Sequence, residues 1–111
     1  MTPSLNRRLV LEAPVRTPDG AGGFVQGWQA LGTLWAQVEP RSGREVSGTD
    51  GVLSRAVCRI TVRGAPVGQS NRPVPGQRFV AGDQVHVIKA VIEEGPRGQY
   101  LVCQCEMEVS P

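Results

Sequence analysis

The sequence has few of the residues on which many functional sites depend. It contains one histidine, His86, one lysine, Lys89, and only two Trp, two Phe and one Tyr among 111 residues. Three cysteines are too few for the four-ligand sites of structural zinc, and their odd number does not predict a disulfide framework. We therefore expect no cofactor, no metal and folding in a reducing cytoplasm.

Long apolar runs are also lacking. No stretch approaches the roughly 20 residues that a membrane-spanning helix needs. The N-terminal residues have a short apolar stretch but not the full apolar core and small-residue cleavage site of a secretory signal. The sequence therefore predicts no membrane association.

Glycine and proline are abundant instead. The 14 Gly and 9 Pro make up about one residue in five, well above average usage. Such a composition favours many turns and short elements and argues against an all-α fold. The length suits one domain, which we expect to span residues 1–111.

Alternating apolar and polar residues predict short strands. In residues 31–40, Leu34, Ala36 and Val38 fall on one face, whereas Trp35 falls on the other. The apolar run within 85–93 occupies both faces, which predicts a central strand covered on each side. The expected strands are residues 7–13, 24–28, 31–40, 57–63, 78–81, 85–93 and 99–108.

Turn residues separate these segments. Asp19-Gly20 and Gly22-Gly23 predict a hairpin turn within 17–23, and Gly82-Asp83 predicts a tight turn. Because proline cannot donate to a sheet, Pro14 is expected to end the first strand. Pro40 is expected to end the third.

Two longer segments lack a sustained period. Residues 41–55 are expected to form a loop with one helical turn, and residues 64–77 a second irregular stretch. The sequence therefore predicts a mainly β protein, a small antiparallel β-barrel or sandwich of six to seven strands with a long irregular loop.

None of the residues that could support catalysis forms a recognisable site. Cys103 and Cys105 lie two apart and are interpreted as core residues on one strand face, and His86 is expected to face a neighbour or solvent. Glu93 and Glu94 point apart as strand neighbours, and Glu106 and Glu108 are interpreted as solvated charges. We therefore expect no enzymatic activity.

The net charge of +2 does not predict a nucleic-acid-binding protein. The cations are nevertheless unevenly spaced, because residues 41–63 contain five arginines against two acids. The five are Arg41, Arg44, Arg55, Arg59 and Arg63, and the acids are Glu45 and Asp50. Inter-subunit ion pairs or solvation are favoured over phosphate contacts with DNA, which stay open as the alternative.

Taken in order, the segments resemble the phage head-tail joining proteins, also called head-closure or stopper proteins. The opening LNRRLVLEAP is similar to the family's first strand, and TLWAQVEPRSGREV carries the most specific similarity. RITVRG, GQRFVAGDQVHVIKAVIEE and YLVCQCEME resemble the strands that follow. The similarity extends over nearly the whole chain.

This resemblance implies a β-barrel that assembles as a ring of 6 or 12 copies at the head-tail junction of a virion. The expected partners are portal and adaptor proteins above, and tail-terminator or tail proteins below. DNA in the channel is a further expected contact. The particle is either a phage or a gene transfer agent, assembled in the bacterial host cytoplasm, and the ring helps to retain packaged DNA.

Within such a ring, the loop 41–55 is expected to face the channel or a neighbouring subunit. Its candidate residues are Arg41, Ser42, Gly43, Arg44, Glu45, Asp50 and Arg55. Trp28 and Trp35 are candidate interface anchors, since tryptophans often dominate binding energy. Adaptor and tail-terminator roles in the same neck remain alternatives, as does a stand-alone nucleic-acid-binding barrel of the OB type.

Overall fold

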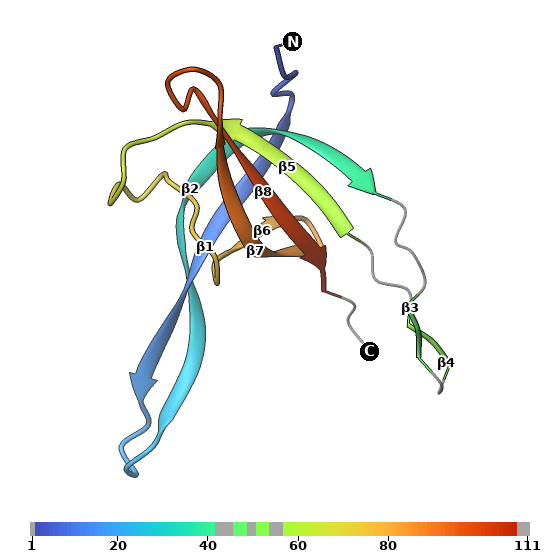
Figure 1. Cartoon of the computed structure of the whole chain (residues 1–111). Helices are drawn as coiled ribbons and strands as arrows, with labels where there is room; N and C mark the ends of the chain where they lie inside the picture. The colour runs from blue at the N-terminus through green and yellow to red at the C-terminus, as the bar shows by residue number, and fades with distance from the viewer. Residues whose placement is uncertain (1, 42–45, 49–50, 54–56, 109–111) are drawn as a thin grey trace.

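The computed structural model describes residues 2–41, 46–48, 51–53 and 57–108. All of its regular elements are strands (Figure 1). They are β1 (Arg7–Pro18), β2 (Phe24–Arg41), β3 (Val46–Gly48), β4 (Gly51–Leu53), β5 (Val57–Arg63), β6 (Arg78–Ala81), β7 (Gln84–Glu94) and β8 (Tyr100–Met107).

Six strands form one antiparallel sheet in the order β1-β2-β5-β8-β7-β6, and β6 pairs with β1 to close the barrel. The closing seam is short, because only Val10, Leu11 and Glu12 of β1 pair with β6. The predicted mainly β fold with six antiparallel strands is therefore confirmed. No helix in the described part of the chain is long and apolar enough to cross a membrane.

The core lies inside the barrel and consists of inward-facing residues of its six strands. Alternation places Cys58, Ile60 and Val62 of β5 inside, as the sequence predicts. The buried cluster comprises Leu9, Leu11, Ala36, Cys58, Ile60, Val62, Phe79, Ile88, Leu101, Cys103 and Cys105. Burial of these side chains supplies most of the stabilisation of so small a fold.

The β1–β2 hairpin is longer than the sequence suggests. Pro14 does not end the first strand, which continues to Pro18, and the two stretches predicted as 24–28 and 31–40 form the single strand β2. Proline is tolerated at position 14 because β6 pairs with β1 only as far as Glu12. Beyond that residue the outer edge of β1 needs no donor.

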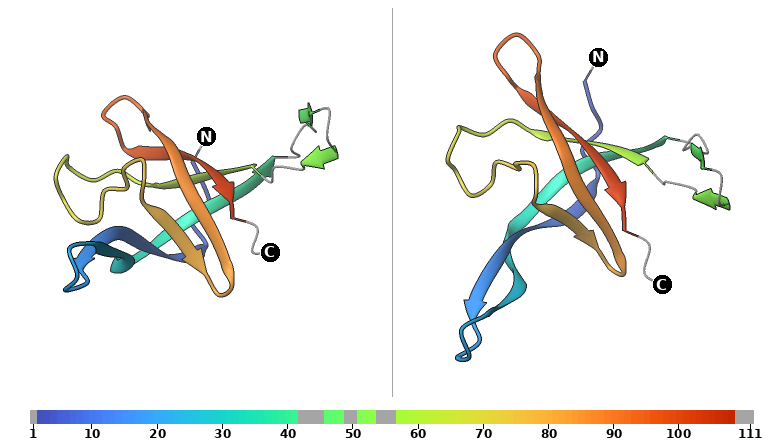
Figure 2. Two further views of the ribbon diagram at one scale, coloured as in Figure 1. Left: turned by 90° about the horizontal axis from the view of Figure 1, so that it is seen from below. Right: turned by 60° about the horizontal axis from the view of Figure 1, so that its bottom comes forward.

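The two strands leave the barrel as a two-stranded arm. We use this name for residues 13–18 of β1 and 24–30 of β2, together with the turn that joins them. The register shifts by one residue at Leu31, opposite the Leu11–Glu12 step, where the chain bulges. In Figures 1 and 2 the arm projects from one side of the barrel.

The hairpin turn is stabilised by its own aspartate, as the Asp-Gly and Gly-Gly pairs predict. The Oδ1 atom of Asp19 accepts hydrogen bonds from the backbone N–H groups of Ala21 (2.8 Å) and Gly23 (3.0 Å). These two bonds lower the pKa of the Asp19 carboxyl below its ordinary value. Gly20 and Gly22 adopt positive φ angles of 82° and 87°, which glycine reaches without strain.

The long loop differs from expectation in the part that the structure describes. No helical turn occurs in the described residues of 41–55, where Val46–Gly48 and Gly51–Leu53 pair as a two-stranded antiparallel sheet. Gly48 and Gly51 form the last residue pair of this sheet. Residues 42–45, 49, 50 and 54–56 lie outside the described part of the chain.

The second irregular segment, residues 64–77, returns along the barrel without forming a strand. Backbone hydrogen bonds join its end to β7, with Ile88 donating to Gln77 (2.9 Å) and Gly76 donating to Ile88 (3.1 Å). Arg72 donates to the carbonyl oxygen of Ala65 at 2.8 Å, and Pro73 is fully buried. The segment is thus held against the barrel despite its lack of periodicity.

The expectation that β7 is covered on both faces is wrong. Its His86 and Ile88 point inward and are buried, but Ile92 is 51% exposed on the outside. A register shift between Ile88 and Ala90 changes which residues face inward. Apolar residues therefore occupy both odd and even positions of the β7 sequence, although the outer face of β7 contacts solvent.

Candidate assembly interface

Three arginine–aromatic pairs lie on the outer face of the β1–β2 hairpin. The guanidinium carbon is 5.9 Å from the ring centroid in the Arg8–Trp35 pair, 4.6 Å in Arg16–Phe24 and 4.0 Å in Arg78–Trp28. We call these six residues the arginine–aromatic stripe. Such cation–π pairs are worth about 0.5–1 kcal/mol each at exposed sites.

Strand register explains the stripe. Leu9 and Leu11 are buried inside, so Arg8 and Glu12 point outward. Arg8 lies directly opposite Trp35, and Arg16 lies opposite Gln26 and reaches along the strand to Phe24. The third arginine comes from β6, where Arg78 pairs with Glu12 in the closing seam.

Arg78 links the seam to the arm. Its Nε donates to Oε1 of Glu12 at 2.7 Å while its guanidinium covers Trp28. The Nη1 atom of Arg78 also lies 3.9 Å from Oε2 of Glu108. Because the Arg78 and Glu12 side chains are about four-fifths buried, this ion pair is less screened by solvent than a typical surface pair.

The two tryptophans that the sequence singles out differ in exposure. Trp35 is 55% exposed, whereas Trp28 is half-buried beneath Arg78. Phe24 and Val25 at the end of the arm are 58% and 59% exposed. Exposed aromatics flanked by arginine match the composition of protein–protein interfaces.

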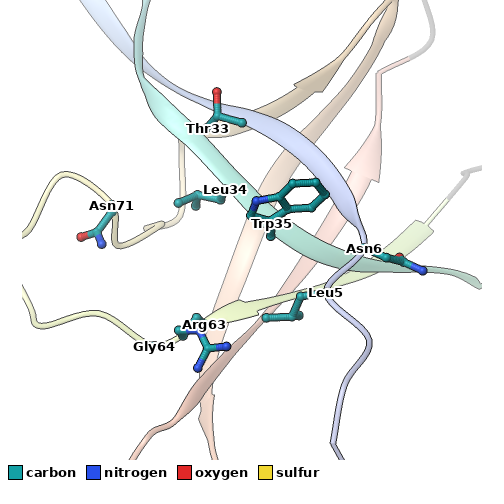
Figure 3. Close-up of a pocket in the computed structure, with 8 residues that line it drawn as sticks. All are labelled: Leu5, Asn6, Thr33, Leu34, Trp35, Arg63, Gly64 and Asn71. Carbon is teal, nitrogen blue, oxygen red and sulfur yellow. The ribbon is translucent and has the colours of Figure 1, made fainter.

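A groove of about 690 Å³ borders Trp35 (Figure 3). It forms because β2 pairs with β5 only from Ala36 onward, so that the two strands diverge where β5 ends at Arg63. The lining residues are Leu5, Asn6, Thr33, Leu34, Trp35, Arg63, Gly64 and Asn71. The groove thus combines an apolar surface with one cation and amide side chains.

Among the candidate loop residues, Arg41 falls within the described part of the chain. It is exposed at the end of β2. Ser42, Gly43, Arg44, Glu45, Asp50 and Arg55 lie outside the described residues, so the loop's role stays a prediction.

The described arginines of 41–63 do not form one cluster. Arg59 lies 3.4 Å from Glu94 across the outer surface, whereas Arg63 borders the groove beside Trp35. The Arg59–Glu94 pair lies within one chain, so the expectation of inter-subunit ion pairs or solvation stays a prediction.

The cysteines are core residues, as the sequence predicts. Cys58 lies opposite Cys105 across the β5–β8 pair, and all three thiols are free and buried. Burial raises the pKa of Cys103 to about 12 and also raises the pKa values of Cys58 and Cys105. Such thiols are poor nucleophiles at neutral pH.

His86 is more buried than expected, with 3% of its surface exposed. It lies opposite Phe79 of β6 and Met107 of β8. Its Nδ1 atom has no hydrogen-bond partner among the described residues. Burial, and secondarily the nearby Arg7 charge, lower the pKa of His86. Of the two expected surroundings, a neighbour or solvent, His86 therefore has the first.

The carboxylates pair with cations from separate directions. Glu93 lies 3.9 Å from Arg72 and Glu94 3.4 Å from Arg59, which confirms that these neighbours point apart. Glu106 lies 3.5 Å from Lys89. Glu106 and Glu108 are thus engaged with cations and are not simply solvated.

Sequence reasoning identified Trp28 and Trp35 but missed their partners. Arg8, Arg16, Phe24 and Arg78 join the stripe only when the hairpin register and the β1–β6 closure are known. One signal was available: residues 8, 12 and 16 share the parity of the polar face of β1.

The family model of the phage head completion protein matches residues 1–108. This chain belongs to the phage head completion protein family. A solved chain from the "Virion of native gene transfer agent (GTA) particle" is 47% identical, with a TM-score of 0.82, and the match covers 97% of this chain and 98% of that chain. None of the curated proteins matches.

Membership in the phage head completion protein family makes this chain a structural, head-associated protein. The sequence resemblance to a phage head-joining family is therefore confirmed.

Proposed function

We propose that this head completion protein is a ring-forming subunit of the head–tail connector, in the stopper position, in a gene transfer agent or phage. It joins the portal and adaptor proteins to the tail and helps to retain packaged DNA. The observation that carries the proposal is the near-complete match to a chain of a gene transfer agent virion at 47% identity.

The exposed features of the fold support this role. Ring subunits need two different contact surfaces that lie on separate parts of the molecule. The arm and the β3–β4 hairpin extend from different sides of the barrel (Figures 1 and 2). Trp28 and Trp35 serve as interface anchors, and the loop 41–55 faces the channel or a neighbouring subunit, where Arg41 contacts a carboxylate or a phosphate.

A stand-alone OB-type nucleic-acid barrel is less well supported. Such proteins stack bases on free aromatic faces beside a basic groove. In this chain Phe24, Trp28 and Trp35 each already have a guanidinium near their rings. Salt-sensitive binding of single-stranded DNA by the isolated chain would favour that alternative.

Deletion of the gene in a producing strain tests the proposal. Electron microscopy is expected to show heads that are filled with DNA or leaking it and that lack tails, and a plasmid copy should restore tailed particles. Normal tailed particles in the deletion strain would reject the connector role. An adaptor or tail-terminator position would be recognised from the place of the chain's density in the particle.

A further inference from the structure

The arm has two strand edges that pair with no other strand in the part of the chain that the structure describes. On β1 the pairing with β6 ends at Glu12. On β2 the pairing with β5 begins only at Ala36. An isolated two-stranded ribbon is marginally stable in water, and unpaired edges are templates for an additional strand.

The hydrogen-bond pattern shows which backbone groups point outward. Asp19 donates to the carbonyl oxygen of Gly23 at 3.1 Å, so this pair is a hydrogen-bonded pair. Because such pairs alternate along an antiparallel ladder, the next pair, Pro18 with Phe24, is not hydrogen-bonded. The same alternation continues along the arm. The residues whose backbone N–H and C=O groups point away from the partner strand are therefore Pro14, Arg16 and Pro18 on β1 and Phe24, Gln26 and Trp28 on β2.

The two edges therefore differ in what they can accept. On β1, two of the three outward positions are proline and have no N–H donor, which blocks strand pairing. On β2, Phe24, Gln26 and Trp28 each offer an N–H and a C=O. The arm is thus protected on one edge and open on the other.

Side chains next to the open edge indicate the chemistry of the added strand. The Arg16 guanidinium extends over the Phe24 ring, so it lies above β2 and within reach of a strand placed beside it. Arg16 forms no ion pair with a carboxylate of the described residues. A carboxylate on the added strand would pair with it.

We infer that the β2 edge from Phe24 to Trp28 accepts, by strand addition, an extended segment of a neighbouring virion protein that carries an acidic side chain. Backbone hydrogen bonds supply affinity in this binding mode, and side chains next to the edge supply specificity. The partner segment needs N–H groups at alternate positions and so lacks proline there.

Pairing between the β2 edges of two copies of this chain does not suit the proposed ring. Pairing two identical β2 edges in an antiparallel manner requires a two-fold axis, whereas a ring with cyclic symmetry has no such axis between neighbours. This step rests on the proposed ring. The free β2 edge and the proline-protected β1 edge do not depend on the proposed ring.

Hydrogen exchange of the full chain tests the edge directly. In the free protein, the amides of Gln26 and Trp28 should exchange rapidly, whereas those of Val25 and Gly27, bonded to β1, should be protected. In assembled particles, the amides of Gln26 and Trp28 should slow by more than about tenfold. Unchanged exchange of these two amides in particles would overturn the inference, and the same protection in a purified dimer would replace the partner by a second copy.

Proline substitution provides a matched test. Gln26→Pro removes an outward N–H without touching the pairing within the arm, and Pro14 and Pro18 show that the ribbon tolerates proline at this parity. Each variant is co-expressed with the wild-type chain, and its share in purified particles is compared with its share in the lysate. Gln26→Pro should be incorporated about tenfold less than Gln26→Ala.

The control lies on the protected edge. Arg16→Pro should be incorporated as well as Arg16→Ala, because no strand is expected there. Equal incorporation of Gln26→Pro and Gln26→Ala would refute the edge, and a loss specific to Arg16→Pro would move the contact to β1. The deletion strain could still form tailed particles while Gln26→Pro is excluded from particles. That result would reject the stopper role but would retain the proposed strand addition.

Discussion

Gly64 lies against the backbone of Gly98. A β-carbon at position 64 would overlap the carbonyl oxygen of Gly98, and the N–H of Gly64 donates to the carbonyl oxygen of Gln99 at 2.7 Å. The start of the loop 64–77 is thereby fixed to the turn between β7 and β8. Only glycine permits this approach of two backbones.

Gly64→Ala is therefore expected to lower the free energy of unfolding by about 1–3 kcal/mol, the usual cost of forcing atoms into occupied space. Urea denaturation of the purified chain measures the change. Gly27→Ala is the matched control, because its β-carbon would lie 3.7 Å from a methyl group of Val15, an ordinary contact. Equal stability of the two variants would show that the contact is relieved by a backbone shift.

The thiols should be inert in the folded chain. A disulfide reagent at pH 8 needs thiolate, and the raised pKa values of the three cysteines keep them protonated while burial blocks access. We expect slow labelling in buffer and rapid labelling of all three in urea. Thr33→Cys, at an exposed position, supplies the reference rate. Labelling of Cys58, Cys103 or Cys105 at that rate would contradict their place in the core.

His86 should make stability depend on pH. Its pKa is lowered in the fold, so below its ordinary value near 6.5 the unfolded chain binds a proton that the folded chain does not. Stability therefore falls as the pH drops from about 6.5 to the folded pKa, by at most about 1.4 kcal/mol per unit. Denaturation of wild type and His86→Leu at pH 7.5 and 5.0 measures it. A slope that is the same in both proteins would assign the pH dependence to other groups.

Substitution of Trp35 should distinguish an effect on assembly from an effect on the free energy of unfolding. Trp35→Ala is expected to change the free energy of unfolding by less than about 0.5 kcal/mol, as for other surface changes. Its incorporation into particles should fall about tenfold or more, as for an interface anchor. Val67→Ala, also an exposed apolar residue at 82%, should be neutral in both measurements. Full incorporation of Trp35→Ala would remove Trp35 from the interface.

Trp28→Ala should behave differently, because its ring is half-buried and covered by Arg78. We expect a loss of about 1 kcal/mol or more in unfolding free energy, from the cation–π contact and the lost burial. Thermal unfolding of the monomer provides the measurement. A stability equal to that of Trp35→Ala would show that the Arg78 contact contributes nothing to the isolated chain.

Much of the barrel could be predicted from local patterns. The tight turn Gly82-Asp83 and the alternation of residues 57–63 locate β5, β6 and the start of β7 to within a residue. These elements are predictable because turn chemistry and side-chain alternation act over a few neighbours.

The errors concern relations between strands. Pro14 ends a strand only if its edge is paired, and the sequence does not show that β6 stops at Glu12. The bulge between Ile88 and Ala90 places Ile92 on the outer face, although the sequence pattern predicts a covered strand there. The arginine–aromatic stripe depends on register across three strands, which no local pattern contains.

The short seam between β1 and β6 has a mechanical consequence. Three residue pairs close the barrel, and the last of them, Glu12 with Arg78, lies where the arm departs and where Trp28 is covered. A force applied to the arm therefore acts on the β1–β6 pairing, the weakest strand pairing in the barrel. The Glu12–Arg78–Trp28 contact stabilises the position at which these two strands would begin to separate.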